Sequence, residues 1–242
     1  MPVKRVWTVL LPLLAVLTGC QGGQSTLDPA GPAASAIATI WWVMLAGAVA
    51  VFVLVMGLLA VAMSPRRRPV LRRPGLLVAL GGLALPIVTL VALLVYGTLA
   101  GRQVIALGQD SDLVVEVSAR QWEWQFTYLD QDGVPVATTL DRLTLPQDAL
   151  VEFRIASEDV IHSFWIPRLG GKMDAIPGRV NTLRLQASEP GALRGQCAEF
   201  CGLEHTHMSF DVEVRPYPEF RAWLQSQPRP QAVAAGVGEG LP

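Results

Sequence analysis

The chain has 242 residues, of which 51% are hydrophobic and 16% are charged, and its formal net charge is −1. So few charges on so apolar a chain exclude a basic nucleic-acid-binding protein, a coiled coil and a disordered chain. The net charge averages two unlike parts, because nearly all of the apolar excess precedes residue 102, whereas residues 104–226 hold about 18 Asp and Glu against about 10 Lys and Arg. Such an acidic segment either keeps a water-exposed domain soluble or attracts a cationic partner.

A short apolar run lies at the start of the chain. Two basic residues precede it, and small residues and Cys20 follow it, which is the arrangement of a bacterial export signal. The four residues LTGC that end at Cys20 also resemble the lipobox of bacterial lipoproteins. We therefore predict that residues 1–19 are a removed signal peptide, that Cys20 is lipidated and that residues 20–35 form an N-terminal linker. A simple apolar anchor with an incidental cysteine is the alternative.

Two uncharged stretches follow, Ala36–Met63 and Gly75–Gly101, and each is long enough to cross a bilayer as a helix. Pro86 lies inside the second stretch, where a membrane helix tolerates it if neighbours satisfy the freed backbone carbonyl. The loop SPRRRPVLRRP between them carries five arginines, which predicts that it stays in the cytoplasm. We predict a transmembrane hairpin over residues 36–102 of a bacterial inner-membrane protein, with both of its ends on the outer, periplasmic side.

Residues 103–225 show a strand-like pattern instead. Four segments are rich in Val, Leu, Phe and Trp with partial alternation: Leu113–Tyr128, Ala149–Ala156, Arg179–Gln186 and Ser209–Val214. Turn sequences such as Asp-Gly and Pro-Gly separate them. Short strands broken this often predict an all-β sandwich or barrel. The Pro/Gly/Ala-rich residues 226–242 predict a disordered tail.

Four potential metal ligands fall within the segment GQCAEFCGLEHTHM, namely Cys197, Cys201, His205 and Met208. Two thiols, an imidazole and a thioether are soft to borderline ligands, which favour copper over hard cations. The thioether in particular favours copper over zinc. The segment therefore predicts a copper site.

Three alternatives to copper stay open on the residues alone. The two cysteines form a disulfide if the compartment is oxidising. The second alternative is a zinc site that uses both cysteines, His205 and either His162 or His207. The third alternative is that the Met208 side chain packs in the hydrophobic core and binds no metal. Each alternative accounts for one residue type, whereas copper accounts for Cys, His and Met together.

The pattern CxExCGxxHxxM, which begins at Cys197, resembles the binuclear copper signature of subunit II of the haem-copper respiratory oxidases, the cytochrome c oxidase family. His162, in HSFWIP, matches the upstream histidine ligand of that family. Trp122, in QWEWQF, matches the aromatic motif that lies between copper and the docked cytochrome c. The segment from Lys172 to Arg179 resembles the KxDAxPGR loop. The resemblance implies a cupredoxin-like Greek-key sandwich after the two-helix hairpin.

Carried onto this sequence, the resemblance implies a binuclear copper centre held by six residues: His162, Cys197, Glu199, Cys201, His205 and Met208. The thiolates would bridge the two ions, each histidine would cap one ion, and the thioether and the Glu199 carbonyl would be weak ligands. The Glu199 side chain would face a magnesium ion at the interface with the catalytic subunit. Trp122 would be the point where electrons arrive, although its alternation with Trp124, Phe126 and Tyr128 also fits a sandwich core.

A metal site whose positions are all filled by protein leaves none for a substrate, and a rigid thiolate-bridged pair changes little on reduction, so its chemistry is electron transfer. The resemblance implies that cytochrome c donates the electrons and that a haem in a catalytic subunit I receives them, with oxygen reduced to water there. Two alternatives stay open: a copper-bearing subunit of a nitric oxide reductase of similar architecture, and a copper-carrying lipoprotein without a catalytic partner. The sequence has no CxxCH haem-attachment motif, and its arginine-rich loop lacks the carboxylate that many relatives carry near a proton channel.

Overall fold

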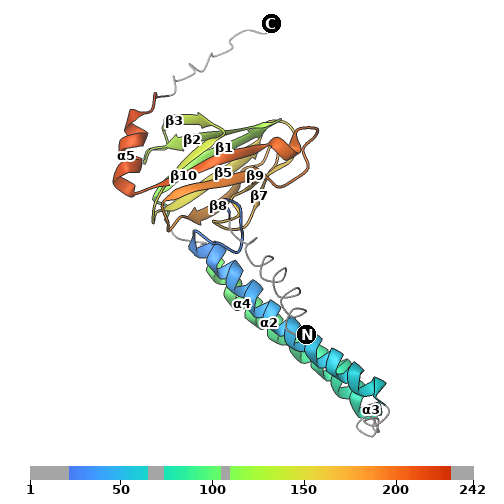
Figure 1. The fold of residues 1–242 in the computed structure, drawn as a ribbon. Helices are drawn as coiled ribbons and strands as arrows, with labels where there is room; N and C mark the ends of the chain where they lie inside the picture. The colour runs from blue at the N-terminus through green and yellow to red at the C-terminus, as the bar shows by residue number, and fades with distance from the viewer. Residues whose placement is uncertain (1–21, 65–73, 105–109, 230–242) are drawn as a thin grey trace, which may run out of the picture. The chain divides into compact units, whose positions relative to one another are not determined.

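A computed structural model describes residues 22–64, 74–104 and 110–229 of the chain. The chain divides into two compact units, one helical and one rich in strands. Residues 33–107 form the helical unit, and the segment before them belongs with residues 108 onward to the other. The helices and strands carry the labels of Figure 1.

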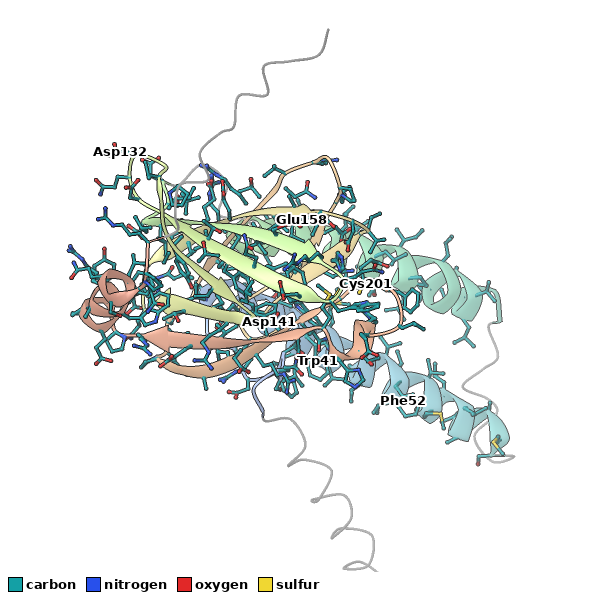
Figure 2. The ribbon with its side chains drawn as sticks, turned by 90° about the horizontal axis from the view of Figure 1, so that it is seen from above. Trp41, Phe52, Asp132, Asp141, Glu158 and Cys201 are labelled. Carbon is teal, nitrogen blue, oxygen red and sulfur yellow. The ribbon has the colours of Figure 1, made fainter. Side chains whose placement is uncertain are left out.

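The helical unit consists of two long apolar helices. The first, α2, spans Pro32–Met63. The second comprises α3 (Pro74–Leu77), the π-helical segment η3 (Val78–Ala84) and α4 (Leu85–Val104). Mean hydropathies of 2.7 and 2.6 make both helices apolar enough to cross a membrane, and their most apolar windows are 0% buried; Figure 2 shows Phe52 projecting freely from α2. The two predicted spans are confirmed, with α2 beginning four residues earlier than expected.

The π-helical segment ends at Ala84, two residues before Pro86. Proline has no N–H to donate and disturbs the hydrogen bonds of the preceding turn. Here the Leu85 N–H bonds the Leu80 carbonyl, five residues back, so a wider π turn keeps the backbone bonded. The predicted signal peptide with Cys20 and the arginine-rich loop lie outside the described residues.

The second unit is a sandwich of two five-stranded sheets, ordered β3-β2-β1-β5-β8 and β4-β10-β9-β6-β7. The first sheet contains β1 (Leu113–Arg120), β2 (Glu123–Leu129), β3 (Pro135–Leu140), β5 (Leu150–Ser157) and β8 (Asn181–Gln186). The second contains β4 (Arg142–Pro146), β6 (His162–Trp165), β7 (Met173–Ala175), β9 (Gly191–Cys197) and β10 (Ser209–Arg215). β1 and β5 pair in parallel, as do β4 and β10, while the other pairs are antiparallel. The predicted order of two long apolar helices followed by an all-β sandwich is confirmed.

The core lies between the two sheets. Alternate residues of β2 point into it because successive side chains of a strand face opposite ways, and Trp124 is fully buried there. Phe164 of β6 stacks on Phe210 of β10 with ring centroids 5.2 Å apart. Gly195 faces Phe210 across the β9–β10 pair, and a Cβ at this position would lie 2.0 Å from Phe210 Cζ. Only glycine therefore lets the aromatic core reach β9, the strand that ends at Cys197.

Several elements differ from the sequence expectation. The expected strand region Leu113–Tyr128 is two strands, because a turn at Gln121 and Trp122 folds β2 back on β1. Five further strands, β3, β4, β6, β7 and β9, are short or poor in large apolar residues, and the pattern did not predict them. Helix α5 (Tyr217–Ser226) was also not predicted. Its Trp223 packs on Tyr128 with ring centroids 5.2 Å apart, so tertiary packing stabilises a helix too short to form alone.

Residues 22–31, which we call the N-terminal strap, lie against the sandwich. The Ala30 N–H donates to the Arg168 carbonyl at 2.8 Å, and the Ser188 N–H donates to the Ala30 carbonyl at 2.8 Å. Arg168 Nη2 lies 3.0 Å from Asp28 Oδ2, and Ala30 is only 2% exposed. The strap precedes the first apolar helix and the sandwich follows the second, so their contact requires both to lie on one side of any membrane that the helices cross.

Glu152 on β5 joins two arginines within the first sheet. Its Oε2 accepts from Arg184 Nη2 at 2.6 Å, and its Oε1 accepts from Arg154 Nε at 3.0 Å. Burial alone would raise the pKa of Glu152, but the hydrogen bonds and charges of Arg184 and Arg154 outweigh burial and hold that pKa below its usual value. A lowered folded-state pKa means that Glu152 stabilises the fold above the unfolded pKa of about 4.3, and that this stabilisation is lost as the pH falls through the folded pKa.

Replacing Glu152 by Gln is expected to lower the free energy of unfolding by about 2 kcal/mol at pH 7, because two charge-assisted hydrogen bonds weaken. The loss should begin to shrink as the pH falls below the unfolded pKa of about 4.3, and it should vanish once the pH has passed the lowered folded-state pKa and the wild-type carboxylate is itself protonated. Denaturant unfolding of the detergent-solubilised chain, followed by tryptophan fluorescence, measures both effects. Glu189→Gln, at an exposed turn, is the control and should change stability by less than about 0.5 kcal/mol. Equal effects of the two substitutions would show that the arginine pairing contributes nothing.

Candidate metal centre

Four parts of the second sheet and its loops build the site at one end of the sandwich. β6 begins with His162, and β9 ends with Cys197. The following loop carries Cys201 and passes through a short 3-10 helix, His205–His207, to Met208 just before β10. Antiparallel pairing of β6, β9 and β10 holds these segments side by side. The site therefore lies on strand ends and one tight loop, supported by the core.

Three of the predicted ligands form one buried cluster. Potential ligand atoms of His162, Cys197 and Cys201 all lie within 4.8 Å of one another. Cys197 Sγ is 3.8 Å from Cys201 Sγ and 3.8 Å from His162 Nδ1. The Cys197 thiol also lies 3.1 Å from the Glu199 carbonyl oxygen. Both cysteines are free thiols, so the structure does not contain the alternative disulfide.

The remaining two predicted ligands lie beside the second thiol. Cys201 Sγ is 3.6 Å from His205 Nδ1 and 3.7 Å from Met208 Sδ. Met208 is 2% exposed and belongs to the hydrophobic core as well, so the core and ligand roles are compatible. The structure thus brings together two imidazole nitrogens, two thiols, a thioether and a backbone carbonyl. By the chemistry of these donors, the residues fit copper better than a hard cation.

Burial raises the pKa of the Cys201 thiol, and the neighbouring Cys197 raises it further, because two thiolates this close would repel each other. The thiolate is the form that binds metal, so binding must release the proton of Cys201. Metal uptake by this cluster is therefore expected to weaken as the pH falls.

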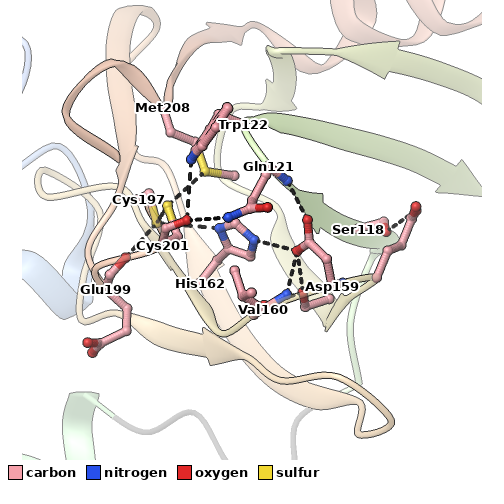
Figure 3. A network of polar contacts seen from close by, with 12 residues as sticks. Ser118, Gln121, Trp122, Asp159, Val160, His162, Cys197, Glu199, Cys201 and Met208 are labelled. Atoms are coloured by element: carbon pink, nitrogen blue, oxygen red, sulfur yellow. Dashed lines mark hydrogen bonds and ion pairs between the residues drawn. The ribbon is translucent and has the colours of Figure 1, made fainter. Parts of the chain in front are cut away.

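Asp159 orients the first histidine (Figure 3). Its Oδ1 lies 2.9 Å from His162 Nε2, which leaves Nδ1 facing Cys197. Backbone N–H groups of Gln121 and Val160 donate to the same carboxylate at 2.7 and 2.6 Å. Burial alone would raise the pKa of Asp159, but these bonds and that of His162 outweigh burial and lower it. A carboxylate that holds the far nitrogen of a ligating histidine is a usual feature of metal sites.

Trp122 lies at the turn between β1 and β2 and packs, partly buried, against the hydrophobic core. Its indole N–H donates to the Cys201 carbonyl at 3.3 Å, and Gln121 Nε2 donates to the same oxygen at 2.7 Å. Gly202 has φ +120°, and a Cβ there would lie 3.2 Å from the indole ring. Glycine therefore permits both the loop conformation and the close approach of the ring. Trp122 is half-buried and connects the surface to the backbone of a thiol ligand.

Two other residues named from sequence lie outside the cluster. The Glu199 carboxylate is 3.7 Å from Lys172 Nζ and is largely exposed, so its side chain faces away from the thiols. The side chain of His207 is 79% exposed and pairs with Glu204 at 3.0 Å, which disfavours it as a zinc ligand. Sequence reasoning missed Asp159 as an orienting group. The only signal was a carboxylate three residues before His162, which is too common a pattern to be specific.

The fold and the site define a class of protein: a β-sandwich attached to two membrane helices, with a buried cluster of soft metal donors at one end. Residues 133–215 match the family model described as cytochrome c oxidase subunit II, periplasmic domain. This match bears out, over residues 133–215, the resemblance that the copper motif indicated.

Individual relatives carry the same name. The chain is 31% identical over 233 residues to cytochrome c oxidase subunit 2 of Alkalihalophilus pseudofirmus, which covers 88% of this chain and 65% of that protein. It is 33% identical over 135 residues to a probable cytochrome c oxidase subunit 2 of Rickettsia felis, which covers 49% of this chain and 43% of that one. The chain thus spans less than two thirds of the length of either relative.

Two solved structures also resemble part of this chain. The periplasmic domain of subunit II of cytochrome oxidase from Bradyrhizobium japonicum is 29% identical with a TM-score of 0.44. The match covers 48% of this chain and 94% of that domain. A heme-copper terminal oxidase dimer contains a chain that is 22% identical with a TM-score of 0.42, over 56% of this chain and 97% of that one.

Proposed function

We propose that this chain is the copper-bearing subunit of a terminal respiratory oxidase, which receives electrons from cytochrome c and passes them to a haem in a catalytic subunit. The observation that carries the proposal is the convergence of His162, Cys197, Cys201, His205 and Met208 in a domain of the subunit II family. The relatives are named as subunits of cytochrome c oxidase, and neither the nitric oxide reductase nor the lone copper carrier is favoured by them.

The proposed centre holds two copper ions, and when bound they would supply a rapid one-electron exchange with little change in geometry. The chain's own residues keep that geometry fixed. Cys197 and Cys201 would supply the thiolate sulfurs that hold the ions, and Asp159 fixes the ring of His162. The aromatic core behind β9 limits movement of the strand that ends at Cys197. Because every donor comes from protein, no position is left for a substrate.

The electron donor is proposed to dock over Trp122. The indole N–H donates to the Cys201 carbonyl, so this ring links the surface to the backbone of a thiol ligand. Glu123, Asp141 and Glu204 line the cavity around it, and Arg120 in the same wall is already paired with Glu123. An excess of carboxylates would steer a basic cytochrome c toward Trp122, and added salt should slow that association.

Three further assignments belong to the same proposal. The strap and the sandwich are placed on the periplasmic side, since the loop between the helices carries five arginines. Cys20 is proposed to carry a lipid after removal of residues 1–19, and it lies outside the described residues. The exposed Glu199 carboxylate is proposed to meet a magnesium ion at the interface with subunit I.

The assembled oxidase carrying Trp122→Phe tests this function. We expect electron arrival from reduced cytochrome c, followed by rapid mixing, to slow by about tenfold or more, a barrier increase of about 1.4 kcal/mol. Copper content should stay unchanged, because Trp122 supplies no ligand. Trp165→Phe is the matched control, since Trp165 is half-buried and also bonds a backbone carbonyl, that of Gly170. Equal rates in wild type and Trp122→Phe would contradict the proposed docking point.

A further inference from the structure

A cavity of about 440 Å³ opens between the N-terminal strap and the metal-binding loop. Three of the proposed ligands, Cys197, His205 and Met208, lie in its wall. Gln24 of the strap and Thr206 of the 3-10 helix also line it, and both are exposed. The volume is far larger than the roughly 30 Å³ that one water molecule occupies in the liquid. The cavity therefore joins solvent to the soft donors.

The cavity on the other side of the loop does not reach these donors. It has a volume of about 550 Å³ and surrounds Trp122, with Gln121 and His207 in its wall. None of the six proposed ligands lines it. The two cavities are therefore distinct, and the adjacent residues Thr206 and His207 of the 3-10 helix line different ones.

Buried donors need a route for their metal. Cys197 is 5% exposed, Cys201 4% and Met208 2%, so an ion cannot meet them directly from bulk water. His205 is half-buried and is the most exposed of the residues that offer an imidazole, thiol or thioether to the centre. We propose that the cavity lined by Gln24 and Thr206 is the port through which Cu(I) reaches the centre. This inference rests on the proposed copper site and adds the direction from which that site is filled.

The donor atoms that line this cavity become softer from its rim toward the metal site, which favours inward movement of a soft ion. The amide of Gln24 and the hydroxyl of Thr206 are hard oxygen donors that hold Cu(I) weakly, whereas imidazole, thioether and thiol follow deeper in. The ion therefore moves by ligand exchange toward stronger donors. Two Cu(I) ions and two thiols give two bound ions and two released protons, with no change in oxidation state.

The strap fixes the outer rim of this port. Gln24 Nε2 donates to Gln196 Oε1 at 2.9 Å, and the Gly23 carbonyl accepts from the Arg194 N–H at 3.2 Å. The Arg194 guanidinium, bonded to Ser209 Oγ at 2.8 Å, also lines the cavity. Its positive charge disfavours a bare cation and favours copper presented in a neutral or anionic complex. The port thus fits Cu(I) delivered by a carrier rather than as a free ion.

The rate of copper uptake tests the port. Full-length, reduced, metal-free chain in detergent is mixed without oxygen with Cu(I) held by the anionic chelator bicinchoninate, and loss of the chelate colour is followed. Thr206→Trp should slow uptake by about tenfold or more and leave the final copper content unchanged. His207→Trp is the matched control, because it places the same bulk on the next residue, in the other cavity. Its rate should stay within about twofold of wild type.

Other outcomes overturn the proposal in distinguishable ways. Equal rates in the two variants and wild type would show that the cavity is not the route. A slow His207→Trp with a normal Thr206→Trp would place the route on the Trp122 side. A wild-type chain that takes up no copper would instead contradict the proposed copper site.

A second pair of variants tests the port if the Thr206→Trp chain does not bind its full complement of copper. Gln24 lies on the strap, outside the ligand loop. Gln24→Trp should therefore slow copper uptake without lowering the final copper content. Thr26→Trp, an exposed strap position outside the cavity wall, should have the wild-type rate. Equal rates for these two variants would overturn the port.

Discussion

Replacing Cys201 by Ser should reduce the copper content of the chain from the proposed two ions to at most one and nearly abolish electron transfer. Cys201 Sγ is the only described sulfur that lies near Cys197, His205 and Met208 together. A hydroxyl is a harder donor that does not bridge soft ions, so the pair cannot form. Loss of an outer partner alone costs about 10–100-fold in affinity or activity, and loss of this ligand should exceed roughly a hundredfold. Metal analysis and oxidase turnover of the assembled complex measure both effects.

Met208→Leu is the graded comparison for that substitution. Leu fills a similar volume in the core, where Met208 is 2% exposed, and removes only the thioether. We expect two coppers to remain bound with a changed reduction potential. If Cys201→Ser keeps two coppers and the wild-type turnover, the bridging role assigned to Cys201 is wrong.

Asp159→Asn should weaken copper binding by about 10–100-fold while the sandwich stays folded. The carboxylate holds His162 Nε2 at 2.9 Å, and an amide of the same shape removes its charge and makes His162 a poorer ligand. The Asp159 carboxylate also accepts a hydrogen bond from the Gln121 N–H at 2.7 Å, so the substitution should also loosen the turn that carries Trp122. Competition with a copper chelator measures the affinity, and the copper spectrum reports the environment of His162.

Glu158→Gln provides the control for the Asp159 substitution. Glu158 is the adjacent carboxylate and accepts a hydrogen bond from Ser118 Oγ at 2.7 Å, but it contacts no proposed ligand. Copper affinity should therefore stay within about twofold of wild type. An Asp159→Asn affinity equal to that of Glu158→Gln would show that the carboxylate does not support His162.

The parts of the fold that the sequence predicted are those with a strong local pattern. An uncharged run such as Gly75–Gly101 has few alternatives to a membrane helix, and dense strand segments such as Ala149–Ala156 agree with β5 to within one residue. β9 was missed because its residues include Gly191 and Gly195, which have low strand propensity. Gly195 is present because Phe210 occupies the space of its Cβ, and that contact comes from another strand.

The residues of the site also divide into those that the sequence predicted and those that it did not. Cys197, Cys201 and Met208 lie within one segment, and their spacing alone predicted a shared centre. The residues alone named His162 only as one of two candidates for a zinc site, and the resemblance selected it, since 35 residues separate it from Cys197. Asp159, the strap and the cavity beside Thr206 could not be predicted, because each depends on contacts between segments far apart in the chain. Spacing predicts ligands on one loop, whereas orienting groups and access routes depend on the tertiary fold.

Copper stoichiometry combined with electron paramagnetic resonance on the full-length chain in detergent tests the central proposal most directly. The result we predict is two coppers per chain that share one unpaired electron, a signal that Cys197→Ser and Cys201→Ser both abolish. A single localised copper, a preference for zinc, or a disulfide between Cys197 and Cys201 in the native complex would contradict the binuclear centre.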